Sequence, residues 1–219
     1  MLFVFRQANE SEPAVLATKA ERRSQAQRRD EAEQRLLDAA VRLVGERGLE
    51  RITLAEVGEA AGYSRGLPAH YFGGKDGMVV ALASHVIDNF GRALERTEHH
   101  SPGLERLLGI AAFYFDSARK TPAATRALFV LLGEGLSNGL VSERLAQLNA
   151  RSLKSFTINL RAAIAAGEAR ADIDADAQAI LVLAGLRGAV SLWLLAPAVI
   201  DLGAVRDEFV ASLRRSLAP

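Results

Sequence analysis

Hydrophobic residues recur at helical spacing along most of the chain, beginning with residues 31–47. In this segment the apolar positions stand three and four residues apart and align along one face of a helix: Leu36, Leu37, Ala40, Val41 and Val44. Gly48 follows, and glycine suits the left-handed backbone that often ends a helix, because it has no Cβ. We therefore predict a first amphipathic helix over residues 31–47.

Two short helices around a glycine turn are predicted next. Thr53 stands three residues before Glu56, the spacing of a capping box, in which each side chain hydrogen-bonds the amide of the other residue. The helix that starts there ends at Gly62, after little more than about two turns. Ser64 is the next candidate N-cap, so we predict a third, short helix over residues 65–71.

The residue types around this turn are typical of a helix-turn-helix. Ala60 and Ala61 are small enough to let the two short helices approach closely, and Phe72 is expected to bury its ring against the first helix. Pro68 would be the fourth residue of the third helix, where its missing amide removes only the first intrahelical hydrogen bond.

The rest of the chain also has a helical pattern. A long helix is predicted from Lys75 to about Glu98, with apolar residues at four-residue steps, and further helices at about 103–119, 122–136, 141–169, 174–195 and 201–217. Proline, glycine or a capping aspartate bounds each of them. No segment has a convincing strand pattern, so we predict an all-α fold of about nine helices.

Composition narrows the classes of function. The 219 residues include no cysteine, which excludes disulfide scaffolds, thiolate zinc sites and cysteine nucleophiles, and fits the cytoplasm. The net charge of +1 argues for no partner by itself. One stretch is locally basic and is expected to contact phosphate or to form a solvated, flexible tail: Lys19, Arg22, Arg23, Arg28 and Arg29.

Signals for catalysis or for a resident metal are weak. No nucleophile, base and orienting group stand at a meaningful spacing, so we do not expect an enzyme, and we expect no cofactor. Asp172, Asp174 and Asp176 resemble the start of a calcium loop, but Ala177 and Leu183 stand where that loop needs glycine and glutamate. We expect these aspartates to cap the helix that follows, and no metal site.

The apolar run of residues 180–199 has about the 20 residues that a membrane span needs. Arg187 stands at its middle, and a central arginine opposes insertion, so we expect no membrane partner. We expect Arg187 to meet an acidic group near a dimer seam or to extend its charge from that seam into water.

An ordered series of motifs is similar to the DNA-binding domain of the tetracycline-repressor (TetR) family. The series covers about residues 31–90 and comprises Leu36-Leu37-Asp38-Ala39-Ala40, Glu46-Arg47-Gly48, the capped second helix, Ala61-Gly62-Tyr63-Ser64-Arg65-Gly66, His70-Tyr71-Phe72 and Lys75. The resemblance implies a transcriptional regulator, most simply a repressor that a small ligand releases from a pseudo-palindromic operator. It also implies three parts: a flexible basic extension (1–29), a helix-turn-helix domain (30–76) and a helical effector-binding and dimerisation domain (77–219).

The resemblance further implies which residues meet double-stranded DNA. Arg65 is expected to read a base edge, with a phosphate contact or a solvated charge as the alternative, and packing is the alternative for Tyr71. The full set of expected DNA contacts is Thr53, Leu54, Ala55, Ser64, Arg65, Gly66, Leu67, Ala69, His70, Tyr71 and Lys75.

One departure from the family pattern weakens the expectation of base reading. Leu67, Pro68 and Ala69 stand where the family more often has threonine, leucine and an aromatic residue, so two polar contacts are missing. This leaves a second hypothesis open, a ligand-binding or interaction protein whose DNA-binding part is degenerate.

The family's C-terminal helices bind a small effector and form a homodimer, and the resemblance implies both here. Aromatic side chains expected to line an effector pocket are Phe113, Phe129, Phe156 and Trp193, with Arg126, Glu134 or Asn159 as polar anchors. The helix over 174–195 is apolar on most faces and needs burial on several sides. The dimer contacts expected on it are Leu181, Gly185, Gly188 and Leu192.

Overall fold

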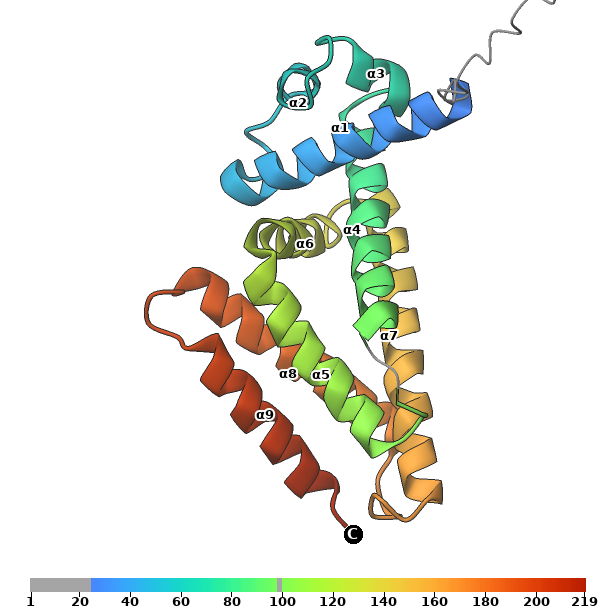
Figure 1. Cartoon of the computed structure of the whole chain (residues 1–219). Helices are drawn as coiled ribbons and strands as arrows, with labels where there is room; N and C mark the ends of the chain where they lie inside the picture. Colours follow the sequence, from blue (N-terminus) through green and yellow to red (C-terminus); the bar gives the residue numbers. More distant parts are fainter. Residues whose placement is uncertain (1–24, 98–99) are drawn as a thin grey trace, which may run out of the picture.

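The computed structural model describes residues 25–97 and 100–219, and within these residues it contains nine helices and no strand (Figure 1). The prediction of an all-α fold is confirmed. The helices are α1 (Gln25–Arg47), α2 (Leu54–Ala60), α3 (Leu67–Phe72), α4 (Lys75–Thr97), α5 (Leu104–Lys120), α6 (Pro122–Glu134), α7 (Gly139–Ala165), α8 (Ala175–Leu195) and α9 (Leu202–Leu217).

The helices form two parts joined by α4. We call α1–α3 the head and α5–α9 the body; α4 runs from the head down beside α7 into the body (Figure 1). The first helix begins six residues earlier than predicted, at Gln25, so residues 25–29 are helical rather than part of a flexible extension. The other basic residues of that stretch, at positions 19, 22 and 23, lie outside the described residues.

The hydrophobic core of the head continues into the body. The apolar face predicted on α1 is buried, and it packs with α4 and with α6, which crosses it. A side chain at Gly45 would overlap the carbonyl of Ala123, so this glycine permits the close crossing of α1 and α6. Ala127 and Leu131 of α6 belong to the same buried cluster as Leu36 of α1. Packing is therefore continuous across the predicted domain boundary at residue 76.

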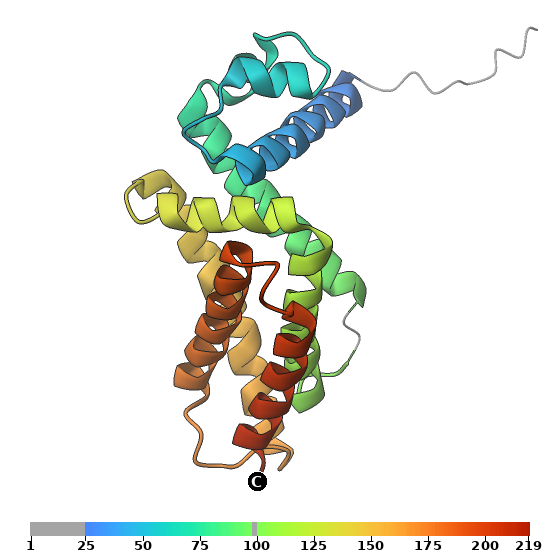
Figure 2. The same cartoon turned by 90° about the vertical axis from the view of Figure 1, so that its left-hand side faces the viewer.

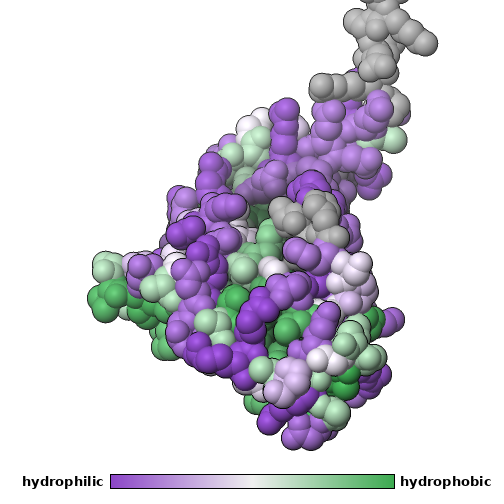
Figure 3. Space-filling model, turned by 60° about the horizontal axis from the view of Figure 1, so that its bottom comes forward, coloured by the Kyte–Doolittle hydropathy of each residue, from purple (hydrophilic) through white to green (hydrophobic). Residues whose placement is uncertain are grey.

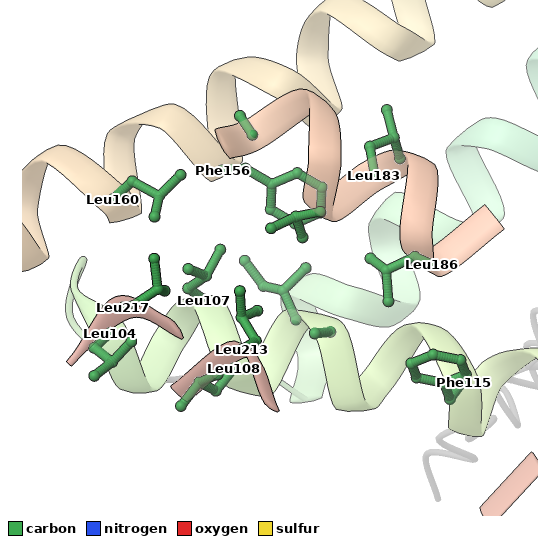
Figure 4. Packing of buried hydrophobic residues seen from close by; sticks show 14 of the residues in the cluster. Leu104, Leu107, Leu108, Phe115, Phe156, Leu160, Leu183, Leu186, Leu213 and Leu217 are labelled. Carbon is green, nitrogen blue, oxygen red and sulfur yellow. The ribbon is translucent and has the colours of Figure 1, made fainter. Parts of the chain in front are cut away.

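The body has a second core, between α5, α7, α8 and α9 (Figure 4). Phe115 of α5 is fully buried, and its ring centroid lies 5.4 Å from that of Phe209 in α9. The guanidinium of Arg214 donates to both oxygens of Glu105, at 2.6 and 2.9 Å. This ion pair fixes α9 against α5 and lowers the pKa of the Glu105 carboxyl.

Among the described helices, α8 is long and apolar enough to cross a membrane by length and composition. Seven of its 21 residues are buried in the body core, as in a core helix of a helical bundle. In Figure 2, α8 and α9 lie in front and form one face of the body. The outward side of α8 carries the apolar residues that this core does not cover.

Candidate nucleic-acid interface and ligand cavity

The capping box predicted for α2 is present. The Oγ1 of Thr53 accepts from the amide of Glu56 at 3.2 Å, and the amide of Thr53 donates to the Glu56 carboxylate at 2.8 Å. The Thr53 hydroxyl also donates to that carboxylate, at 2.8 Å. These two bonds from Thr53 lower the pKa of the Glu56 carboxyl below its ordinary value, with a smaller contribution from the Arg47 charge. The cap fixes where α2 begins, and it leaves Thr53 exposed on the surface of the head.

The close approach of α2 and α3 occurs at Gly58, not at Ala60 and Ala61 as predicted. A Cβ at Gly58 would lie 2.5 Å from the carbonyl oxygen of Ser64 and 3.1 Å from the Cδ of Pro68. Ala60 is exposed, and Ala61 only half-buried. The prediction was wrong because residue size alone does not show which face of a short helix meets its neighbour.

The third helix begins later than predicted. Its N-cap is Gly66 rather than Ser64, whose carbonyl instead accepts the amide of Leu67 at 3.1 Å in the preceding turn. Pro68 therefore lies in the first turn, where the amides have no intrahelical partner, so its ring removes no hydrogen bond. Gly62, with φ of +78°, makes the turn before α3, and Gly73, with φ of +71°, ends the helix.

The α3 segment lies on the side of the head that faces away from the body (Figure 1). The side chain of Arg65 is 73% exposed and pairs with Glu59 of α2 at 2.7 Å. Among the other DNA-contact candidates, Thr53, Ser64, Gly66, Ala69 and His70 are exposed, and Leu54, Ala55, Leu67, Tyr71 and Lys75 are partly buried. The structure thus gathers all of the candidates on the head and at the start of α4.

Tyr71 and the end of α3 are held by contacts within the head. The Tyr71 hydroxyl donates to the carbonyl of Arg29 at 3.3 Å, and the Arg29 guanidinium lies 5.8 Å from the centre of the ring. A side chain at Gly77 would overlap the carbonyl oxygen of Phe72. Gly77 therefore allows α4 to start tightly against α3, and its role was missed because nothing local in the sequence signals it.

The body contains an apolar cavity with an interior volume of about 70 Å³. Of the four aromatic residues predicted to line a pocket, Phe156 lines it. Phe113 stacks at 5.4 Å on Phe90, which lines it, whereas Phe129 and Trp193 pack against the body core. The cavity walls come from α4–α8: Val86, Ile87, Phe90, Leu94, Ile110, Tyr114, Leu128, Leu148, Ser152, Ser155, Phe156, Leu183 and Arg187.

The polar groups of this cavity differ from the predicted anchors. Arg126 is exposed, Glu134 accepts from Asn138 at 3.2 Å, and Asn159 is buried but bonded to backbone atoms of Gly103 and Ser155. Tyr114 and Arg187 take their place in the cavity wall.

The acidic group expected beside Arg187 is not found within the described residues, and the residue lines the cavity. Its Nη2 donates to the side-chain oxygen of Asn149 at 2.7 Å, and no acidic group pairs with it within the described part of the chain. Burial raises the pKa of the Tyr114 hydroxyl, while the charge of the nearby Arg187 and a weak hydrogen-bonding contact from it oppose part of that rise.

A polar contact between the buried His85 and the exposed Asp38 connects α4 to α1 beside the cavity. The Nε2 of His85 lies 2.8 Å from the Asp38 carboxylate of α1 and 2.9 Å from the side-chain nitrogen of Asn89. These three residues line a neighbouring groove, which shares Val86 and Phe90 with the cavity. The cavity therefore adjoins the contact between α4 and the head.

The predicted dimer residues fall into two groups. Leu181 and Leu192 are 64% and 62% exposed, and Gly188 has open space where a side chain would stand. Gly185 instead faces inward, because a Cβ there would lie 2.8 Å from the ring of Phe209. Figure 3 shows a hydrophobic area at its left-hand edge, the side on which the α8–α9 connection lies in Figure 1; Leu195 and Val199, in this region, are highly exposed.

Within residues 25–97 and 100–219, no group of three or more histidine or acidic side chains could hold a metal ion. Asp174 caps α8 as expected, accepting from the amides of Asp176 and Ala177 at 3.0 and 3.1 Å. Asp172 pairs with Arg170 at 3.5 Å.

An exposed helix-turn-helix on a helical body that contains a cavity is typical of transcriptional regulators that carry a DNA-binding and a ligand-binding part in one polypeptide. Residues 36–82 match the profile described as "Bacterial regulatory proteins, tetR family", and residues 103–218 match "BetI-type transcriptional repressor, C-terminal". The chain belongs to the TetR family, in its BetI-type branch.

Curated relatives carry the same family name. The chain is 33% identical over 126 residues to the HTH-type transcriptional regulator BetI of Serratia proteamaculans, an alignment that covers 56% of this chain and 63% of that protein. It is 38% identical over 86 residues to BetI of Brucella canis, covering 38% and 43%. The chain thus matches less than two thirds of the length of these relatives.

Solved structures have the same fold. A transcriptional regulator from Saccharomonospora viridis in complex with choline has a TM-score of 0.78 at 19% identity, over 87% of this chain and 99% of that one. A TetR-family regulator from Rhodococcus sp. has a TM-score of 0.75 at 19% identity, over 86% and 100%. FadR from Bacillus subtilis, in complex with stearoyl-CoA, has a TM-score of 0.69 at 18% identity, over 84% and 98%.

Proposed function

We propose that the chain is a cytoplasmic repressor that binds operator DNA as a homodimer and leaves it when a small molecule enters the body. One observation carries the proposal: α4 begins directly after the exposed α3 and supplies four of the residues that line the cavity. A displacement of α4 by a ligand would change the position of α3.

The proposed DNA contacts divide by role. Arg65, with Gly66 and Leu67, would approach base edges in the major groove, whereas Thr53 and Lys75 would meet phosphates. Arg65 must leave Glu59 to reach DNA, and an exposed ion pair of this kind is worth only about 0–1 kcal/mol. A bidentate bond to guanine discriminates by about 1–3 kcal/mol, so the exchange favours DNA.

The other candidates would support those contacts. Tyr71 is engaged with α1, so its first role is to orient α3, and His70 is the better placed of the two for a phosphate. Pro68 packs into α2 without loss of a hydrogen bond, so the proline does not distort α3, although Leu67 and Ala69 still supply no polar contact.

The effector would act through α4. A ligand shifts the equilibrium between DNA-binding and released forms only by its difference in affinity for the two, and couplings of this kind are typically about 1–3 kcal/mol. Fold relatives have been solved with choline, stearoyl-CoA and triclosan, which supports a ligand role for the cavity. The Asp38–His85 contact offers a direct path from α4 to α1.

The homodimer would form through the outward face of α8, flanked by α9. A stripe at helical spacing is exposed on α8, and its members are Leu181, Ala184, Gly188, Leu192 and Leu195. Exposed apolar areas of this kind mark interaction surfaces. A two-fold axis through this face would set two α3 helices on one side of the dimer, as a pseudo-palindromic operator requires.

A band-shift experiment with the DNA upstream of the chain's own gene tests the proposal, together with selection of bound fragments from random DNA. We expect a dimer that binds a two-fold symmetric site and loses affinity steeply with salt. A dimer that binds no DNA at low salt would favour a ligand-binding protein, and a stable monomer would remove the repressor mechanism.

A further inference from the structure

The cavity in the body combines an apolar lining with the side chains of Arg187 and Tyr114. We infer that it binds a compact, largely apolar molecule with one anionic group, most simply a carboxylate, that docks on Arg187 and Tyr114. The inference rests on the proposed function, because it names the class of effector for the same cavity.

The shape and lining of the cavity favour a small apolar body. Nine of the 13 lining residues are aliphatic or phenylalanine side chains. An interior of about 70 Å³ is small beside the roughly 300–1,000 Å³ of common ligand pockets, so the ligand is compact or opens the helices further. Arg187, Tyr114, Ser152 and Ser155 are the remaining lining residues.

Two of these residues carry buried polar atoms without a partner. Within the described residues, the Tyr114 hydroxyl and the Arg187 Nε are the buried side-chain nitrogen or oxygen atoms that make no hydrogen bond of good geometry. The two side chains lie close together, and burial raises the pKa of the Tyr114 hydroxyl more than a weak contact from the Arg187 guanidinium lowers it, but this contact leaves the hydroxyl proton and the Nε proton free to donate. Buried polar groups in proteins are nearly always paired, and the exceptions call for an explanation. Both residues line the same cavity, from α5 and α8.

The charge of Arg187 is also not neutralised. Asn149 accepts from its Nη2 and orients the guanidinium, but an amide carries no charge. No aspartate or glutamate is among the described residues that line the cavity. A carboxylate would accept from the Nε of Arg187 in a charge-assisted bond.

Tyr114 would complete the site as a second donor. Burial raises the pKa of its hydroxyl, so the group keeps its proton at neutral pH and can donate to an anion. A bound anion would thus satisfy both unpaired atoms at once.

The same arrangement disfavours a cationic ligand. The rings of Phe90, Tyr114 and Phe156 could attract a quaternary ammonium ion by cation–π contacts. The full positive charge of Arg187 stands in the same low-dielectric wall, where repulsion between like charges is only weakly screened. We therefore expect choline to bind more weakly than an acid of similar size.

Titration calorimetry on the full chain tests the inference with matched probes. The acids are butyrate, hexanoate, octanoate and benzoate; the neutral controls are the corresponding amides, and the cation is choline. We expect at least one acid to bind at least tenfold more tightly than its amide and more tightly than choline.

Variants assign that preference to the two residues. Arg187→Met keeps the apolar stem and should reduce the acid-to-amide ratio to about one, whereas Arg187→Lys should retain part of it. Tyr114→Phe should weaken acid binding several-fold. Arg126→Met, on the exposed surface of α6, is the matched control and should change nothing. Circular dichroism checks that each variant is folded, and a misfolded Arg187→Met leaves Arg187→Lys and Tyr114→Phe to decide.

The outcomes separate this inference from the proposed function. Equal binding of acids and amides, tighter binding of choline, or no binding of any acid would overturn the inference. DNA binding is measured in parallel without any ligand. A chain that binds DNA but no acid remains a regulator with a different effector, whereas a chain that binds acids but no DNA contradicts the repressor and leaves the anion site standing.

Discussion

The head and the body differ in how far apart in sequence their key residues stand. In the head, the capping box joins residues three positions apart, and glycines with positive φ at 62 and 73 bracket α3. In the body, the cavity takes its wall from five helices between α4 and α8. Interactions between residues close in sequence thus determine the structure of the head, which would bind DNA. Contacts between distant helices determine the cavity, which would bind a ligand.

The two parts also differ in how completely their polar groups are paired. The two unpartnered buried side-chain atoms found within the described residues both lie in the body, on Tyr114 and Arg187. In the contact between head and α4, the buried His85 has two polar neighbours. Buried polar groups that are paired make a structure rigid, whereas unpaired polar groups around a cavity can hydrogen-bond a bound ligand.

The largest expected effect tests whether the body alone carries dimerisation. The double substitution Leu181→Glu with Leu192→Glu places two charges on the outward face of α8. Because hot-spot residues contribute about 2 kcal/mol or more each, we expect the dimer dissociation constant to rise more than about a hundredfold. Sedimentation velocity measures this.

Leu140→Glu is the control for that variant. Leu140 is 61% exposed at the start of α7, away from α8, and its substitution should leave the dimer intact. A double variant that stays dimeric would move the interface to another face and contradict our placement.

The next effect tests whether the head depends on the contact at Gly58. Gly58→Val puts a branched side chain against the Ser64 carbonyl and should destabilise the head by about 1–3 kcal/mol. We expect DNA affinity to fall while acid binding in the body persists. Urea unfolding, band shifts and calorimetry measure the three quantities. Gly133 lies on α6 with open space around it, so Gly133→Ala should lower neither stability nor DNA affinity. If Gly133→Ala lowers them as much as Gly58→Val does, steric crowding is not the cause of the loss.

A comparable effect, restricted to one base pair, is expected from Arg65. Arg65→Ala should reduce discrimination at one operator position by about 1–3 kcal/mol, because a guanidinium fork reads guanine. Binding to a set of single-base operator variants measures this discrimination.

Lys75→Ala should instead weaken binding to all sequences and lower the slope of log binding constant against log salt concentration by about one. A uniform loss from Arg65→Ala would assign that residue to phosphate.

The smallest effect concerns the cap of α2. Thr53→Ala removes the capping oxygen and should cost about 1 kcal/mol of stability. The folded pKa of Glu56 lies below its ordinary value of 4.5, so its contribution is present above that pH and is lost as the pH falls through the lowered pKa. We expect the stability difference between the native chain and Glu56→Gln to shrink below pH 4.5 in urea titrations; a constant difference would contradict the capping role.

The sequence predicted the helices of the head well because their ends depend on neighbouring residues. Periodicity and the Thr53–Glu56 pair placed α1 and α2, and Gly62 placed the turn. The start of α3 was misplaced because Ser64 satisfies the cap preference, yet the turn uses its carbonyl instead. The N-cap preference of serine is therefore not realised at Ser64, because the turn before α3 holds this residue in place through its carbonyl.

The cavity was less predictable because its lining depends on helix crossing angles that no local pattern encodes. Phe156 was expected from its residue type, but Phe129 and Trp193 satisfy the same criterion and pack into the core. Arg187 stands out in the sequence as a charge in an apolar helix, but the sequence does not show that it lines a cavity. An unpaired charge in a core helix was the signal that pointed to the site.

Because α4 lies in both parts, its residues cannot change independently. Val86 belongs to the buried cluster that includes α1 and also faces the cavity. Descendants of this chain that acquire new effectors should therefore vary at Ser152, Ser155 or Leu183 on α7 and α8, and keep the α4 wall. Selection for altered ligand response in the laboratory should follow the same division, with substitutions on α4 appearing mainly as constitutive repressors or as proteins that never bind DNA.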